Sequence, residues 1–202
     1  MLEHLTFRSD LPRVEDPKIV IVQPEPRLRS LILERIVISA GVQSAFQHCW
    51  THLTQLWVTG TCNDDGPVLT LFALCPHLKY SVFSEVDIPL RVVAARALAH
   101  STHLSLEVRV PRGTGFLLDA LTLPSLTRLV ITDSSRIGPS TWRRNELRGF
   151  LARSRCPLET LHIHSWRAPS QKDDQAAYAA LIPTLKHLCL EIVEQPRKTP
   201  QG

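Results

Sequence analysis

A recurring pattern of apolar residues predicts an α/β protein: a solenoid of about eight short parallel strands in a curved sheet, with helices on its convex side. Three observations support this prediction. The pattern L-x-x-L-x-L recurs at steps of about 25 residues. Proline stands just before several copies of the pattern, and apolar residues with helical spacing occupy most segments between the copies.

The pattern has three slots per copy, and any large apolar residue is accepted in a slot. The eight copies are Leu2/Leu5/Phe7, Leu28/Leu31/Leu33, Leu53/Leu56/Val58, Leu78/Ser81/Phe83, Ser101/Leu104/Leu106, Leu126/Leu129/Ile131, Leu158/Leu161/Ile163 and Leu185/Leu188/Leu190. Apolar residues fill 22 of the 24 slots, whereas a hydrophobic content of 44% would fill about 11. The strands should therefore centre near residues 5, 31, 56, 81, 104, 129, 161 and 188.

Proline and helical periodicity predict what lies between the strands. A proline precedes the first slot by two residues at Pro26, Pro76, Pro124 and Pro183, and by one at Pro157. Because proline ends a helix and favours extended backbone before it, this position suits the start of a strand. Apolar residues at helical spacing predict helices over 42–49, 68–75, 90–98, 140–151 and 173–182.

A strand, a turn and a helix repeated at about 25 residues form the leucine-rich-repeat unit. One unit cannot bury its own apolar face, so a continuous core forms only when units stack. The alternative is a doubly wound α/β domain, which would show continuous apolar strands and a glycine-rich phosphate loop, and the sequence has neither. We expect one leucine-rich-repeat-like domain over residues 1–193, with an irregular connection at 9–25 and a disordered tail at 194–202.

Residues between the slots should point outward on the concave face, because side chains alternate along a strand. Ile32, Trp57 and Val82 would be neighbours there, with Gln55 and Tyr80 alongside. An apolar patch with an aromatic centre and a polar rim is typical of a binding hot spot, unless a loop or helix of the same chain covers it. The predicted partner-binding residues are Ile32, Gln55, Trp57, Tyr80, Val82, His103, Arg128, Val130, His162, His164 and His187.

Catalytic and metal-binding signals are weak. His162 and His164 on one strand would face His187 and Cys189 on the next, and these residue types can bind zinc. However, nine histidines spread over a sheet become neighbours by chance, so we predict no metal site. No catalytic motif or nucleophile–base pair can be named, so we predict no enzymatic activity, no cofactor and no small-molecule substrate.

Composition and charge indicate an ordinary soluble protein of the cytoplasm or nucleus. No apolar run is long enough for a membrane helix, and the five cysteines are widely spaced without a CxxC motif, as expected for reduced thiols. The net charge of +4 is too mild to indicate nucleic acid by itself. The alternative function is binding of nucleic acid or an acidic partner through an arginine-rich helix, which carries Arg143, Arg144, Arg148, Arg153 and Arg155.

Four runs resemble the C-terminal leucine-rich-repeat regions of fungal F-box-like proteins: LFALCPHLKY (71–80), LTLPSLTRLVITD (121–133), LRGFLARSRCPLETLHI (147–163) and LIPTLKHLCLEI (181–192). The resemblance implies the substrate-recognition subunit of a cullin–RING ubiquitin ligase, in which the F-box docks on an adaptor and the repeats select the target. This sequence departs from the family because it starts inside a repeat, with no three-helix F-box before it. We therefore expect the chain alone to self-associate and to leave the adaptor unbound.

Overall fold

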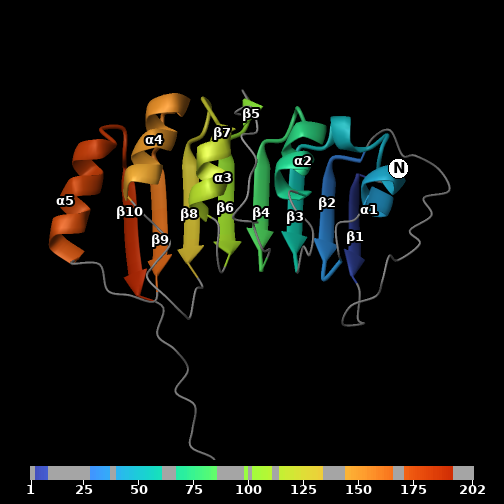
Figure 1. Cartoon of the computed structure of the whole chain (residues 1–202), viewed down its shortest axis with the longest axis horizontal. Helices are drawn as coiled ribbons and strands as arrows, with labels where there is room; N and C mark the ends of the chain where they lie inside the picture. Colours follow the sequence, from blue (N-terminus) through green and yellow to red (C-terminus); the bar gives the residue numbers. More distant parts are fainter. Residues whose placement is uncertain are drawn as a thin grey trace, which may run out of the picture.

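A single parallel sheet forms the centre of the computed structural model, which describes residues 3–8, 28–36, 40–60, 67–85, 98–99, 102–110, 114–133, 144–165 and 171–192. In this part of the chain the sheet has eight strands, and their spatial order follows the chain without reversal (Figure 1). The strands are β1 (His4–Arg8), β2 (Ser30–Glu34), β3 (Gln55–Thr59), β4 (Tyr80–Ser84), β6 (Ser105–Val110), β8 (Arg128–Asp133), β9 (Thr160–Ser165) and β10 (His187–Ile192). Every neighbouring pair is parallel.

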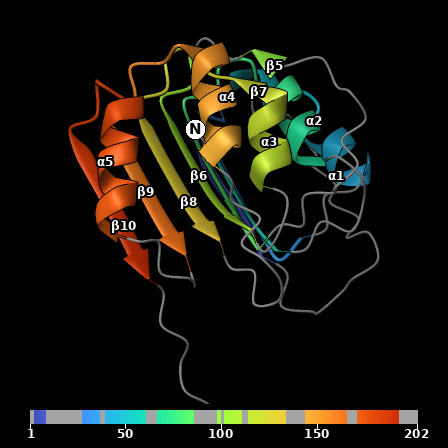
Figure 2. The ribbon, with the colours of Figure 1, turned by 60° about the vertical axis from the view of Figure 1, so that its left-hand side comes forward.

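Helices connect the strands and lie along one face of the sheet (Figures 1 and 2). The described residues hold α1 (Ala40–Ala45), α2 (Pro67–Leu74), α3 (Thr114–Ala120), α4 (Arg144–Ser154), α5 (Gln171–Leu181) and the 3₁₀ turn η1 (Trp50–His52). A smaller parallel pair, β5 (Leu98–Ala99) and β7 (Leu121–Thr122), accompanies them. The sequence predicted helices near α1, α2, α4 and α5. It did not predict α3, whose seven residues are too few for a clear helical period.

The core lies between the sheet and the helices. Leu31 and Leu33 of β2, and Leu56 and Val58 of β3, are buried, and the same two positions are buried in most other strands. The helices contribute apolar stripes that include Phe46, Leu71, Phe72, Leu117, Leu147, Phe150, Tyr178 and Ile182. The alternation of buried and outward side chains therefore matches the slots of the sequence pattern.

One hydrogen-bond arrangement recurs at the start of every strand after β1 in the eight-stranded sheet. The N–H groups of Arg29 and Ser30 both donate to the carbonyl oxygen of Glu3, at 2.9 and 3.1 Å. Equivalent pairs of N–H groups follow in register along the sheet, with the acceptor carbonyls Arg29, Thr54, Lys79, Leu104, Thr127 and Glu159. Because each acceptor lies one step further along the sheet, the same local geometry repeats from strand to strand.

A second recurring feature ends three consecutive strands. Arg35, Gly60 and Glu85 follow β2, β3 and β4 at intervals of 25 residues, and all three have positive φ. Their N–H groups donate to the last or penultimate carbonyl of the next strand, namely Thr59, Ser84 and Arg109. Gly60 has the least usual backbone of the three, with φ +131°, in a region that L-residues with a side chain rarely adopt.

We expect Gly60→Ala to lower the free energy of unfolding by about 1–3 kcal/mol. An added Cβ would lie 2.8 Å from the backbone Cα of Arg35, which cannot move without disturbing β2. Gly149→Ala in α4 is the matched control, because its Cβ would meet only a guanidinium nitrogen of Arg153, at 3.3 Å. Alanine is also more favourable than glycine inside a helix by about 1 kcal/mol. Denaturant unfolding measures both variants, and an unchanged Gly60→Ala protein would contradict this turn geometry.

The predicted strand positions are confirmed except for the fifth, where the predicted slots were wrong by two residues. Ser81 pairs with Leu106 and Phe83 with Val108, so the slots of this copy are His103, Leu106 and Val108. A slip of two leaves the in–out alternation unchanged and the number of apolar slots equal, so the pattern could not detect it. With the correction, the first slots run from Leu28 to His103 in steps of 25 residues. The 9–25 connection, the 194–202 tail and residues 90–97 of the helix expected over 90–98 lie outside the described residues, while Leu98, the last residue of that expected helix, belongs to strand β5 instead.

Candidate functional site

The outward side chains of the strands form what we call the open face, on the side of the sheet opposite the helices. Strand pairing arranges them in three rows across the sheet. The first row is His4, Ser30, Gln55, Tyr80, Ser105, Arg128, Thr160 and His187. The middle row is Thr6, Ile32, Trp57, Val82, Glu107, Val130, His162 and Cys189. The third row is Arg8, Glu34, Thr59, Ser84, Arg109, Thr132, His164 and Glu191.

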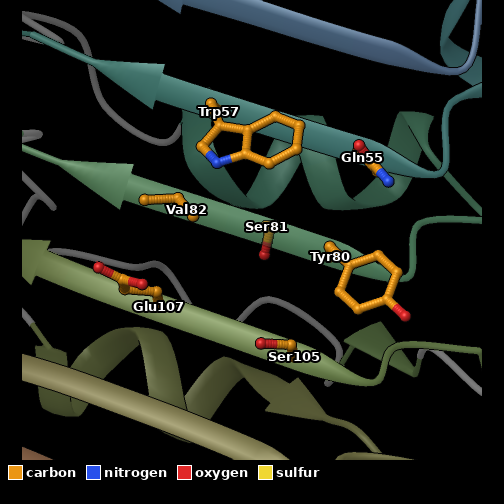
Figure 3. A pocket seen from close by; sticks show the side chains of 7 residues that line it. All are labelled: Gln55, Trp57, Tyr80, Ser81, Val82, Ser105 and Glu107. Atoms are coloured by element: carbon orange, nitrogen blue, oxygen red, sulfur yellow. The ribbon is translucent and has the colours of Figure 1, made fainter.

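A depression of about 300 Å³, the central hollow, lies at the middle of the open face (Figure 3). It spans β3, β4 and β6 and is lined by Gln55, Trp57, Tyr80, Ser81, Val82, Ser105 and Glu107. Its floor is formed by Val82 and Ser105, which are smaller than their neighbours. Val82 lies between Trp57 and Glu107 in the middle row, and Ser105 pairs with Tyr80 in the first row. Tyr80 is 42% exposed, the most exposed large apolar side chain of the described residues.

The predicted patch of apolar side chains is present. Ile32 pairs with Trp57, Trp57 with Val82, and Gln55 with Tyr80. Trp57 is half-buried, while its sequence neighbours on β3 are buried. The strand register predicted for this part of the sheet is therefore confirmed.

Glu107 is the functional candidate that the sequence analysis missed. The misplaced fifth copy assigned Ser105 to the middle row, but Glu107 occupies that position beside Val82. Its side chain is only 18% exposed, and Oε1 accepts a hydrogen bond from Nε of Arg109 at 2.5 Å. Arg109 is 57% exposed and is not among the residues that line the hollow. The hollow therefore combines two aromatic rings with a mostly buried carboxylate.

His103 does not lie on the open face, so its predicted role in partner binding is wrong. Both His103 and Ser81 are buried in slots that are apolar elsewhere, and Ser81 Oγ lies 3.1 Å from His103 Nε2. Nδ1 of His103 lies 3.2 Å from the carbonyl oxygen of Leu78, which can only accept. In the neutral imidazole, Nδ1 therefore donates to this carbonyl, and Nε2 accepts from the Ser81 hydroxyl. The pair has the residue types of a nucleophile and a base, but it packs within the core beneath the hollow.

A polar cluster occupies the open face of the last two strands. His162 faces Cys189, and His164 faces Glu191, whereas His187 faces Thr160. Glu191 binds His164 Nδ1 at 2.9 Å and accepts from the Cys189 thiol at 3.1 Å. Among the described residues, no group of three potential ligands is arranged to hold a metal ion.

The same contacts shift the ionisation of the cluster. The pKa of Glu191 is lowered by the hydrogen bond from Cys189 and then by the charge of His164. That hydrogen bond raises the pKa of the Cys189 thiol. Burial lowers the pKa of His162, and the charge of Arg128 on the neighbouring strand adds to this effect. This end of the open face is therefore polar and charged, in contrast to the central hollow.

Two further predicted residues differ in how much surface they offer. Arg128 is exposed on β8 beside Ser105, next to the hollow. Val130 points to the open face by register, but it is only 3% exposed. Val130 lies between Glu107 and His162, whose larger side chains flank it on both sides. It was predicted to contact a partner, and its burial contradicts that role.

The arginine-rich segment offers fewer available cations than its sequence suggested. Arg153 of α4 donates to the carbonyl oxygen of Leu118 at 2.7 Å and lies 3.7 Å from a carboxylate oxygen of Asp119. Arg153 therefore joins α4 to α3. Arg148 and Arg155 are exposed, while Arg143 and the side chain of Arg144 lie outside the described residues.

No protein-family model, curated protein or solved structure matches the sequence significantly. Within the described ranges, no helix has the length and apolar character needed to cross a bilayer. In the described part of the chain, the fold and the site together define an α/β protein with an eight-stranded parallel sheet, helices along one face of it, and an aromatic hollow on the other.

Proposed function

We propose that this chain is a protein-interaction module built as a leucine-rich-repeat-like solenoid, and that its open face binds the partner. The observation that carries the proposal is the central hollow, where Trp57 and Tyr80 offer aromatic surface beside polar groups. Aromatic residues in a depression with a polar rim are typical of the few residues that dominate binding energy in protein interfaces.

The strand order supports the solenoid. In a doubly wound sheet the strand order reverses at a switch point, and helices cover both faces. Here the order follows the chain from β1 to β10, and the helices of the described residues lie along one face. The hydrogen bonds at the start of each strand and the left-handed residues at Arg35, Gly60 and Glu85 also repeat with the sequence period. Stacked equivalent units have this kind of regularity.

The finer proposal is that the repeats recognise the substrate of an F-box-type ubiquitin ligase. Three of the four motifs behind the resemblance share one local structure, a turn around Pro76, Pro124 and Pro183. In these turns the N–H groups of Leu78, Leu126 and Leu185 donate to the carbonyl three residues earlier, at 3.0–3.1 Å. The turns at Pro76 and Pro183 follow α2 and α5, the turn at Pro124 follows β7, and each directs the chain into the next strand of the large sheet.

The test uses proximity labelling in cells with the full chain and two matched double variants. Trp57→Ala/Tyr80→Ala alters the hollow, and Arg148→Ala/Arg155→Ala alters exposed cations near α4. We expect captured proteins to be lost with the first variant and kept with the second. A captured protein, once purified, should likewise bind the arginine variant more tightly than the Trp57→Ala/Tyr80→Ala variant. If only the arginine variant loses binding, and the binding falls steeply with salt, the arginine-rich segment is the interface instead. Adaptor-dependent ubiquitination of the captured protein would test the ligase role.

A further inference from the structure

We propose that the central hollow accepts an arginine side chain from the partner, held between the indole of Trp57 and the carboxylate of Glu107. This inference rests on the proposed function and adds the chemistry of the partner. The occupant is an exposed segment with one arginine flanked by apolar residues, which would pack on the neighbouring Ile32.

The geometry suits a cation on a long apolar stem. Trp57, Val82 and Glu107 are successive partners across β3, β4 and β6 (Figure 3). Strands are about 4.8 Å apart, so roughly 10 Å separates the backbones that carry the indole and the carboxylate. The methylenes of an arginine can lie on Val82, while the guanidinium contacts the aromatic ring on one side and the carboxylate on the other.

The charges of the hollow point the same way. Of the seven residues that line it, Glu107 alone has a charged side chain, and it is only 18% exposed. A carboxylate with little access to water forms stronger hydrogen bonds with a cation than one in free solution. Arg109, two residues further along β6, donates to Oε1 and partly neutralises this carboxylate, and the exposed Arg128 lies on the neighbouring strand, so an entering guanidinium would use the other carboxylate oxygen. A carboxylate has room for more than one donor, so a second guanidinium can bind beside it.

The polar rim favours arginine over lysine. Gln55, Ser105 and the Tyr80 hydroxyl supply oxygen acceptors around the hollow. A guanidinium has five N–H donors in a planar fork and stacks on aromatic rings, whereas an ammonium is a compact and strongly hydrated charge. An arginine can therefore use the carboxylate, the rings and the rim together.

The experiment titrates the purified chain with short blocked peptides that differ only at a central position between two leucines. That position holds arginine, lysine, citrulline or glutamate; citrulline has the shape of arginine without its charge. We expect the arginine peptide to bind about tenfold more tightly than the citrulline peptide. Glu107→Gln should abolish this preference, and Arg109→Ala should increase it because a competing guanidinium is removed. Glu34→Gln, which alters a carboxylate paired with Arg8 outside the hollow, is the matched control and should preserve it.

Equal binding of the arginine and citrulline peptides, no binding of either, or tightest binding of the glutamate peptide would each overturn the arginine proposal. The proposed function would survive these results if captured proteins still depend on Trp57 and Tyr80. Thermal unfolding of each variant shows whether the fold is retained, so a lost preference in a folded Glu107→Gln protein supports the proposal directly.

Discussion

Leu56→Ala should lower the free energy of unfolding by about 2–5 kcal/mol, whereas Trp57→Ala should lower it far less. The two residues are adjacent on β3, but Leu56 is fully buried against the helices, while Trp57 faces the hollow. Truncating Leu56 leaves a cavity in a packed core, and truncating Trp57 removes surface that is already partly in water.

Denaturant unfolding measures the free energy of unfolding of the two variants. Binding of a captured partner should rank the two variants in the opposite order. Trp57→Ala should weaken partner binding more than Leu56→Ala does in the fraction that remains folded. Similar destabilisation by both changes would mean that the strand faces are assigned incorrectly, because a shift of one residue exchanges the two faces of a strand.

The second large effect is expected at the buried pair of Ser81 and His103. His103→Leu removes the acceptor of the Ser81 hydroxyl, and Ser81→Ala removes the donor to Nε2 of His103. Each single change should cost about 1–3 kcal/mol, because it leaves a buried polar group without the partner that it has now. The double variant Ser81→Ala/His103→Leu should be more stable than the sum of the single effects predicts, because neither polar side chain of the pair remains buried without its partner.

A double-mutant cycle from denaturant unfolding measures this coupling. The matched control is Thr184→Val, which removes a hydroxyl that makes the same kind of bond far from the pair, donating to the carbonyl of Leu158 at 2.7 Å where the chain enters β10. Combined with His103→Leu, it should give additive effects. Additive effects of Ser81→Ala and His103→Leu would show that the two side chains do not stabilise each other.

Local periodicity was sufficient for most of the fold. Apolar residues with period two make strands whose faces differ, and apolar residues with helical spacing make the covering helices. Leu31, Leu56, Leu129 and Leu161 were assigned to the core from this alternation alone, and all four are buried. The apolar part of the hollow followed from the same rule, because Trp57 and Val82 lie between slots that were correctly assigned.

The assignments that failed depended on how β6 pairs with its neighbours. The sequence around β6 fits the slots equally well in two frames that differ by two residues, since both frames contain one polar slot. Pairing with β4 decides between them, and it moves His103 into the core and Glu107 into the hollow. The burial of Val130 likewise depends on the size of side chains on the two neighbouring strands, which no single strand reveals.

The sequence by itself therefore determined the position of most strands, the residues that face the core, and the apolar half of the candidate site. These properties are local, because they depend only on the spacing of apolar residues along one segment. Only the tertiary structure decided where the polar residues lie relative to other strands: Ser81 beside His103 inside, and Glu107 beside Val82 at the hollow. Residues such as Ser81 and His103, 22 positions apart, become neighbours only through strand pairing, and a two-residue change of register replaces every such partner while preserving the apolar pattern.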